Sequence, residues 1–332
     1  MFCFQCQEAA KGQGCTTTGM CGKEGTTADL QDLLIFNLKG IGVIAKKARA
    51  AGIAVPEKTG RFIAQALFTT ITNVNFSDEN IIAWIHQAQD VKKALYASVK
   101  NQIGDDLHDS ATWFSTDVSE FKAKAASVGV LATENEDVRS LRELLILGLK
   151  GIAAYADHAA VLGVTRDEIW NFLYDALAAT TEELSVDDMV ANVLKAGEIT
   201  VTTMAALDEA NTTAYGHPEL SQVNIGVGTN PGILISGHDL KDMEELLKQT
   251  APNEIAKVEE ELIKEGMPKE EIHKLCDVHL ALFQESLGQE EHIAPEGHSI
   301  HILMEEHKML LKFSDELKKI INEMRAFKDL NS

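Results

Sequence analysis

Four cysteines lie close together at the N-terminus and could bind one metal centre. Cys3, Cys6, Cys15 and Cys21 fall within nineteen positions, and Cys276 is the single cysteine in the rest of the chain. A Cys-x-x-Cys pair brings two thiolates to one metal or cluster, and two more cysteines from a short loop complete a four-thiolate set. Such a set suits tetrahedral zinc or an iron–sulfur cluster.

Zinc and disulfide bonds are the alternatives to a cluster. Structural zinc sites usually contain two Cys-x-x-Cys pairs, whereas the second pair here is Cys15-x5-Cys21 and follows a linker rich in glycine and small polar residues. Disulfides need an oxidising compartment, and the N-terminus lacks the basic and apolar regions of a signal peptide. The spacing therefore favours a cluster over zinc, and both over disulfides, in a chain that we expect to be cytoplasmic.

Two weaker candidate metal groups lie near the C-terminus. Cys276 and His279 are three residues apart on a predicted helix, and His298, His301 and Glu305 lie near the start of the last predicted helix. A His-x-x-x-Glu spacing suits two ligands to one iron, but one helix supplies only part of a di-iron site. The sequence therefore offers at most a partial second iron site there.

Composition limits the partners that the chain could have. The formal net charge is −21, which argues against nucleic acid and anionic membrane surfaces. No uninterrupted apolar run is long enough to span a membrane, so we expect no membrane contact. An acidic surface would suit a basic redox partner protein, although it equally suits a soluble protein with no such partner.

An internal repeat organises the chain after the cysteines. The segments Asp29–Ile53 and Ser140–Val164 both have apolar residues at helical spacing and share the pattern LL-I-x-x-LKGI at positions 111 residues apart. Similar second and third helices follow each segment. The sequence therefore predicts two tandem three-helix units, from Asp29 to about Asn101 and from about Val138 to Leu207.

Several residues are expected to set the ends and the packing of these helices. Ser77 and Ser185 are predicted N-caps of the third helices, and Gly52 is a predicted C-cap of the first. Gly40 and Gly151 lie inside helices, where glycine costs about 1 kcal/mol relative to alanine. We expect a close helix–helix crossing at both matched glycines.

A different pattern follows the repeats. Ile233–Ser236 is a predicted strand and Asp239–Lys248 a predicted amphipathic helix, with Gly237 and His238 between them, where open α/β sheets place ligands. The remaining chain is predicted to be helical, in the segments Glu254–Gly266, Lys269–Gly288 and Gly297–Phe327. A lone strand lacks ladder partners, so it could pair with a neighbouring segment, dock on a second subunit or exchange between protomers.

The predicted fold class is mainly α, with one short β–α unit. The predicted regions are a cluster loop at residues 1–28, the two repeated three-helix bundles at 29–220, a truncated Rossmann-like β–α unit at 221–250, and a helical region at 251–332.

The first 250 residues or so resemble the hybrid cluster protein (prismane) family. The resemblance is carried by the cysteine spacing within FCFQCQEAA and GCTTTGMCGK, by both repeats, by YGHPE and by NPGILISGHDLKDMEELLKQT. The spacing is similar to the family's class I, which implies a [4Fe-4S] cluster on the four N-terminal cysteines. The resemblance also implies a first domain of two three-helix bundles, in agreement with the repeat.

The resemblance implies an oxidoreductase function with an incomplete second site. Family members are associated with hydroxylamine or nitric oxide reduction and nitrosative stress, at a hybrid iron–sulfur–oxygen cluster. His238 matches the family's histidine ligand to that cluster, but the other ligands, two glutamates and four cysteines, would come from later in a family chain. After Thr250 this sequence departs from the family, so His238 is expected to be a vestigial ligand position.

Residues from about 253 onward resemble a helical domain that precedes hemerythrin-like domains, followed by the first helix of such a bundle.

The sequence and these resemblances lead to three hypotheses about function. The favoured one is an electron-transfer module with one [4Fe-4S] cluster and a redox partner protein; the second is a hydroxylamine or nitric oxide reductase completed by another subunit; the third is a non-enzymatic oxygen or nitric oxide sensor. A homo-oligomer would also be compatible with the sequence.

Overall fold

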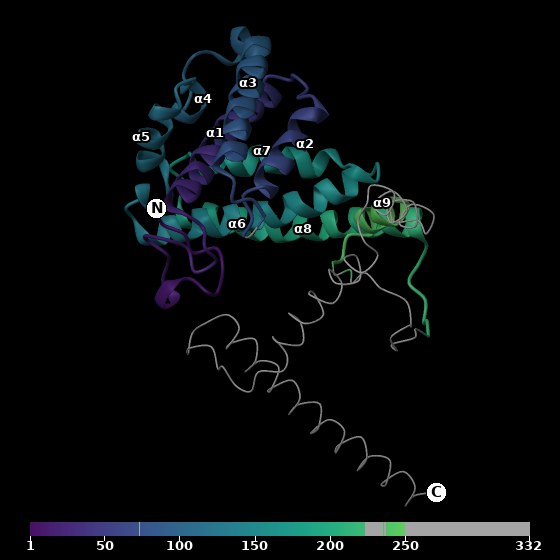
Figure 1. The fold of residues 1–332 in the computed structure, drawn as a ribbon. Coiled ribbons are helices and arrows are strands. Elements are labelled where there is room, and N and C mark those ends of the chain that lie inside the picture. The colour runs from purple at the N-terminus through teal and green to yellow at the C-terminus, as the bar shows by residue number, and fades with distance from the viewer. Residues whose placement is uncertain (73, 223–234, 236, 250–332) are drawn as a thin grey trace, which may run out of the picture. The chain divides into compact units, whose positions relative to one another are not determined.

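The computed structural model describes residues 1–72, 74–222, 235 and 237–249. These residues are mainly helical, as predicted from the sequence. The chain divides into two units, one containing residues 1–224 with 238–243 and the other containing residues 225–237 with 244–332. The first unit carries the cysteine loop and both repeats (Figure 1).

The helices of the described residues reproduce the internal repeat. α1 and α6 occupy equivalent positions 111 residues apart, α2 is equivalent to α7, and α3 to α8, while α4 and α5 connect the repeats. The elements are η1 (Ala10–Gly12), α1 (Gly25–Ala50), α2 (Glu57–Phe68), α3 (Asp78–Ile103), α4 (Asp109–Thr112), α5 (Val118–Val128), η2 (Val130–Ala132), α6 (Glu136–Val161), α7 (Asp167–Ala179), α8 (Val186–Tyr215) and α9 (Leu240–Gln249).

The predicted helix caps are confirmed. The Ser77 hydroxyl accepts a hydrogen bond from the Asn80 N–H at 3.2 Å, and the Ser185 hydroxyl accepts one from the Asp188 N–H at 3.1 Å. Each bond satisfies one of the free N–H groups at a helix start. α3 and α8 therefore begin where the sequence predicts.

Glycines with positive φ end the first helix of each repeat. Gly52 has φ +77° and Gly163, its equivalent in the second repeat, has φ +86°. A left-handed residue at this position allows the next N–H to return to the last turn, as Ile53 N–H does to the Ala48 carbonyl at 2.9 Å. The expected role of Gly52 is confirmed.

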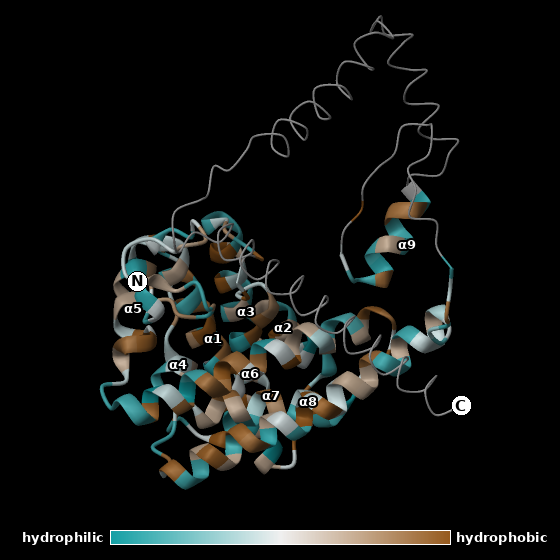
Figure 2. Ribbon diagram, turned by 90° about the horizontal axis from the view of Figure 1, so that it is seen from below, coloured by the Kyte–Doolittle hydropathy of each residue, from teal (hydrophilic) through white to brown (hydrophobic). Residues whose placement is uncertain are grey.

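The two repeats interlock through their second helices. α1 packs mainly against α3 of its own repeat and α7 of the other, and α6 packs mainly against α8 and α2. Figure 2 shows apolar residues along the helices α1, α6 and α7. One continuous apolar core therefore joins the repeats.

Close packing explains one of the two matched glycines but not the other. A Cβ on Gly40 would lie 2.1 Å from the Ser110 carbonyl oxygen, so α4 rests directly on α1 there. A Cβ on Gly151 would have no atom within 4 Å, and the residue is exposed. The expected crossing at Gly151 is wrong, because α6 has no equivalent of α4 at that turn. A close crossing between the two repeats lies at Gly42 on α1, where a Cβ would lie 2.8 Å from the Tyr174 carbonyl oxygen in α7.

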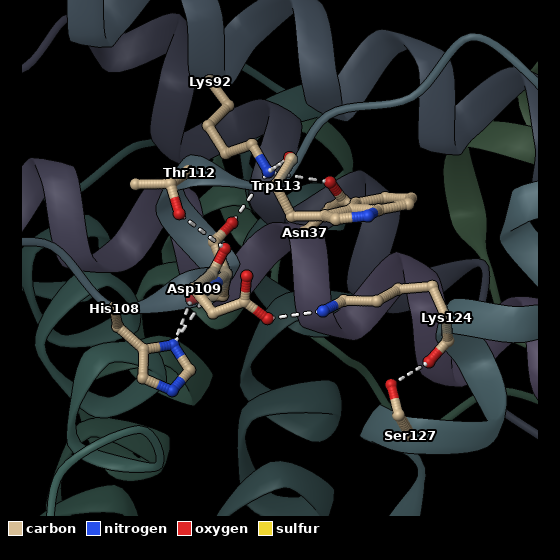
Figure 3. A network of polar contacts seen from close by, with 9 residues as sticks. Asn37, Lys92, His108, Asp109, Thr112, Trp113, Lys124 and Ser127 are labelled. Atoms are coloured by element: carbon tan, nitrogen blue, oxygen red, sulfur yellow. Dashed lines mark hydrogen bonds and ion pairs between the residues drawn. The ribbon is translucent and has the colours of Figure 1, made fainter.

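A buried lysine fixes the short helix α4 to the repeat (Figure 3). Lys92 on α3 is fully buried, and its Nζ donates to Asn37 Oδ1 at 3.0 Å, to the Ser110 carbonyl at 2.7 Å and to the Trp113 carbonyl at 2.8 Å. His108 accepts a hydrogen bond from the Ser110 N–H at 3.1 Å and so caps α4. One ammonium group therefore links α1, α3 and the connection between the repeats.

α6 is the one described helix that is long and apolar enough to cross a membrane by length and composition. Half of its most apolar window is buried inside the protein, where the helix packs against α2 and α8. Core helices of soluble proteins have the same length and composition. The absence of membrane contact stays a prediction.

The described part of the C-terminal half is short. α9 confirms the helix predicted over Asp239–Lys248, to within one residue at each end. The strand predicted over Ile233–Ser236 and the three helices predicted after Thr250 lie outside the described residues, apart from Ile235.

Candidate functional site

A short antiparallel bridge brings two of the four cysteines face to face. The Cys3 N–H donates to the Cys15 carbonyl at 3.0 Å, and the Cys15 N–H donates to the Cys3 carbonyl at 2.8 Å. Residues directly opposite each other in an antiparallel pair project their side chains to the same side. The bridge therefore directs the Cys3 and Cys15 thiols to one side of the loop.

The other two cysteines lie in tight turns of the same loop. The Ala9 N–H returns to the Cys6 carbonyl at 3.2 Å, and Gly22, directly after Cys21, has φ +85°. A Cβ on Gly19 would lie 3.1 Å from Cys21 Sγ. Glycines at these positions allow the chain to turn close to the thiols. Larger side chains there would displace the thiols.

The four thiols form no disulfide bonds and are therefore available as metal ligands. All four are free, Cys15 is buried, and the other three are partly exposed. The Ala10 N–H points at Cys15 Sγ at 3.4 Å, the kind of contact that stabilises a thiolate and tunes a bound cluster. In the described part of the chain, no three Cys, His, Asp or Glu side chains are grouped closely enough for a single metal ion. In a [4Fe-4S] cluster each thiolate binds a different iron, and four free cysteines in one short loop are the type of ligand that such a cluster needs.

Two buried lysines connect the loop to the helical repeats. Lys150 on α6 is 5% exposed, and its Nζ donates to Gln5 Oε1 at 3.0 Å and to the Thr70 carbonyl at 3.2 Å. Lys23, two residues after Cys21, is 1% exposed and donates to Gln31 Oε1 at 2.8 Å. The loop is therefore held at both ends by ammonium groups inside the protein.

Equivalent charged residues of the two repeats meet beside this loop. Asp32 and Lys39 on α1 correspond to Glu143 and Lys150 on α6, each 111 positions later. Burial raises the pKa of Asp32 to about 7, with the Glu143 carboxylate adding to the rise, and burial also raises the pKa of Glu143. Burial lowers the pKa of Lys150 to about 8 and lowers that of Lys39. The internal repeat thus places two acids and two lysines together.

A cavity of about 30 Å³ lies between these residues and the loop. Its lining includes Cys3, Gln5, Asp32, Glu143 and Lys150. The space is about that of one water molecule, and its walls carry several polar groups. This cavity joins the cysteine loop to the charged residues of both repeats.

His238 lies apart in the sequence but has defined neighbours. Its ring centroid is 6.3 Å from that of His158, and the His158 Nδ1 is 3.3 Å from Asp239 Oδ2. His238 itself is exposed. The weaker candidates lie outside the described residues: Cys276, His279, His298, His301 and Glu305.

The lysine anchors and the charged residues beside the loop were not among the candidate residues selected from the sequence. A signal for them was present, because aligning the repeats pairs Asp32 with Glu143 and Lys39 with Lys150. Charged residues at matched positions of apolar helices indicate a shared buried environment. The contact between Lys150 and Gln5 could not be read from the sequence, since it joins residues 145 positions apart.

Comparison with known proteins identifies the family. A profile of the Prismane/CO dehydrogenase family matches residues 1–281. The chain belongs to this family. The match to this prismane family extends beyond residue 250, where the sequence was expected to depart from it.

Several prismane-family relatives are similar to the chain over 75% of its length. Hydroxylamine reductase of Nitratidesulfovibrio vulgaris is 59% identical over 259 residues, that of Desulfosudis oleivorans is 58% identical over 252, and that of Halothermothrix orenii is 55% identical over 259. In each case the match covers 46% of the relative. The chain thus spans about half the length of the relatives that it matches.

Proposed function

We propose that Cys3, Cys6, Cys15 and Cys21 bind one [4Fe-4S] cluster and that the chain is an iron–sulfur electron-transfer protein of the prismane family. The observation that carries the proposal is the hydrogen-bonded bridge that directs Cys3 and Cys15 to the same side of a loop holding four free thiols. When bound, the cluster would accept and release one electron at a time.

The residues of the chain would hold the cluster and control its surroundings. The Ala10 N–H would donate to the Cys15 thiolate, and Lys150 and Lys23 would fix the loop on α6 and α1. Met20, on the turn before Cys21, is 58% exposed, so the loop is accessible to a partner. We infer that electrons pass there to or from a redox partner protein in a reducing, cytoplasmic environment.

Anaerobic purification with iron and sulfide analysis tests this proposal. We expect about four irons and four sulfides per chain, with a broad visible absorption. Cys15→Ala should abolish this absorption, whereas Cys276→Ala, the matched change at the cysteine outside the loop, should leave it intact. Zinc without iron in the purified protein would refute the cluster, and so would a wild-type spectrum for Cys15→Ala.

Hydroxylamine reduction is a second candidate function. It is favoured by the name of the relatives, which are 55–59% identical to this chain. This function would need further ligands beside His238, and a second subunit could supply them. About eight irons per chain in a reconstituted complex, with hydroxylamine-dependent oxidation of a reduced dye, would support it. His238→Ala should abolish that activity and leave the absorption of the four-cysteine cluster intact. Bleaching of the isolated chain by His238→Ala would contradict the separation of the two sites.

A further inference from the structure

Lys150 joins the cysteine loop to the core of the helical repeats. Its Nζ donates to Gln5, which lies between Cys3 and Cys6, and to the Thr70 carbonyl just after α2. The side chain is 5% exposed. The ammonium group therefore has a fixed place beside the first two cysteines.

Among the described residues, the carboxylic acids Asp32 and Glu143 line the same small cavity as Lys150, but neither accepts a hydrogen bond from it. In the described part of the chain, the hydrogen-bond partners of both Lys150 and Lys23 are neutral amide or carbonyl oxygens. A buried ammonium group without a counter-charge is costly. Asp32 and Glu143 supply part of that counter-charge, because both raise the pKa of Lys150, while burial raises the pKa of each acid.

Lys150 lies close to the cysteine loop, because it lines the same small cavity as Cys3. Burial lowers the pKa of Lys150, while Asp32 and Glu143 raise it. The pKa of Lys150 stays at about 8, so most of the ammonium group is charged at neutral pH.

We propose that Lys150, held by its hydrogen bond to Gln5, is a positioning residue that places a buried positive charge against the four-cysteine loop and raises the reduction potential of the cluster bound there. The inference rests on the proposed function. Reduction adds one electron to a cluster that is already anionic. A nearby positive charge stabilises the reduced form more than the oxidised form, and the effect is strong where water is excluded.

The internal repeat supplies a matched control. Lys39 occupies the same place as Lys150 in the LKGI pattern of the first repeat, and burial lowers the pKa of both. Lys39 lines a larger polar cavity of about 260 Å³ with His108 and Arg142, and Glu143 lines both this cavity and the small one beside Cys3. None of the cysteines is among the groups that shift the pKa of Lys39. A change at Lys39 removes a half-buried lysine of the same group of charges that does not line the cavity beside Cys3.

The experiment compares reduction potentials by anaerobic titration followed by EPR, with iron measured in every sample. At the potential where half of the wild-type clusters are reduced, Lys150→Met should lower the ratio of reduced to oxidised cluster about tenfold. Lys150→Arg, which keeps the charge, should restore the ratio to near the wild-type value. Lys39→Met should lower it much less, because Lys39 does not line the cavity beside Cys3.

Each outcome separates this inference from the proposed function. Wild-type protein without iron would refute the proposed function and the inference together. Wild-type iron with an unchanged ratio in Lys150→Met, or an equal fall in Lys39→Met, would overturn the inference alone. If Lys150→Met does not retain iron, Lys150→Gln decides the question, because it removes the charge and keeps a side-chain amide that can hydrogen-bond to Gln5. A lower ratio in Lys150→Gln would support the inference, and an unchanged ratio would overturn it.

Discussion

Replacement of Lys92 by methionine tests whether burial controls the charge of this residue. Lys92 is fully buried, and burial lowers its pKa to about 7, although Asp109 acts in the opposite direction. An unfolded lysine has a pKa of about 10.4. Between pH 7 and 10 the folded protein therefore binds fewer protons than the unfolded chain, and the free energy of unfolding rises with pH in this window.

The magnitude follows from the width of that window. Each pKa unit of difference corresponds to about 1.4 kcal/mol, so this group should raise the stability of the wild-type protein by about 2 kcal/mol between pH 7 and 9. Lys92→Met removes the titrating group and leaves three acceptors without a donor: Asn37 Oδ1 and the carbonyls of Ser110 and Trp113. We expect a loss of about 1–3 kcal/mol at pH 7, and a further loss of about 2 kcal/mol relative to wild type at pH 9.

Urea unfolding at pH 7, 8 and 9, followed by circular dichroism, measures this difference. Lys93→Met is the matched control, because Lys93 is exposed yet lies over the same Phe114 ring as Lys92, at 5.2 Å from its centroid. Its stability should follow the wild-type pH dependence. A gap between wild type and Lys92→Met that stays constant from pH 7 to 9 would refute the reasoning. It would show that the three acceptors keep the ammonium group charged despite its burial.

Two further stability predictions use the repeat. Gly42→Ala should destabilise the protein by about 1–3 kcal/mol, because the new methyl group would lie 2.8 Å from the Tyr174 carbonyl, whereas Gly151→Ala, with no atom within 4 Å, should stabilise it by up to about 1 kcal/mol. Similar unfolding midpoints in urea for the two variants would contradict this assignment of the close crossing. The raised pKa of Asp32 means that the folded state holds a proton that the unfolded chain loses near pH 4, so stability should fall as pH rises toward 7. Asp32→Asn should remove about 1–2 kcal/mol of that fall between pH 5 and 7, and an unchanged pH profile in the variant would count against a buried, protonated Asp32.

The sequence predicted the helices well because the features that define a helix depend on residues close together in the chain. Apolar spacing, the Ser77 and Ser185 caps and the left-handed Gly52 depend on residues within one or two turns. The repeat at 111 positions then predicted that each half would have the same helix order. The four cysteines could be grouped from sequence for the same reason, since they share one short loop.

The packing partners of equivalent residues could not be predicted from the repeat. Gly40 and Gly151 occupy the same place in the LKGI pattern, but α4 covers the first and nothing covers the second. The difference arises from the segment that connects the repeats, which has no counterpart after the second one among the described residues. A repeated sequence thus fixes helix order without fixing what each helix touches.

The sequence by itself determined the four-cysteine loop, the helix ends and the doubled helix order, since each depends on residues close together in the chain. Only the tertiary structure decided that the second helix of each repeat packs on the first helix of the other. It also decided that Lys150 reaches Gln5 across 145 positions and that Asp32 and Glu143 are brought near it. The physical reason is that burial and charge depend on which surfaces meet in space. The electrostatic environment of the loop therefore belongs to the folded repeats and not to the cysteine motif.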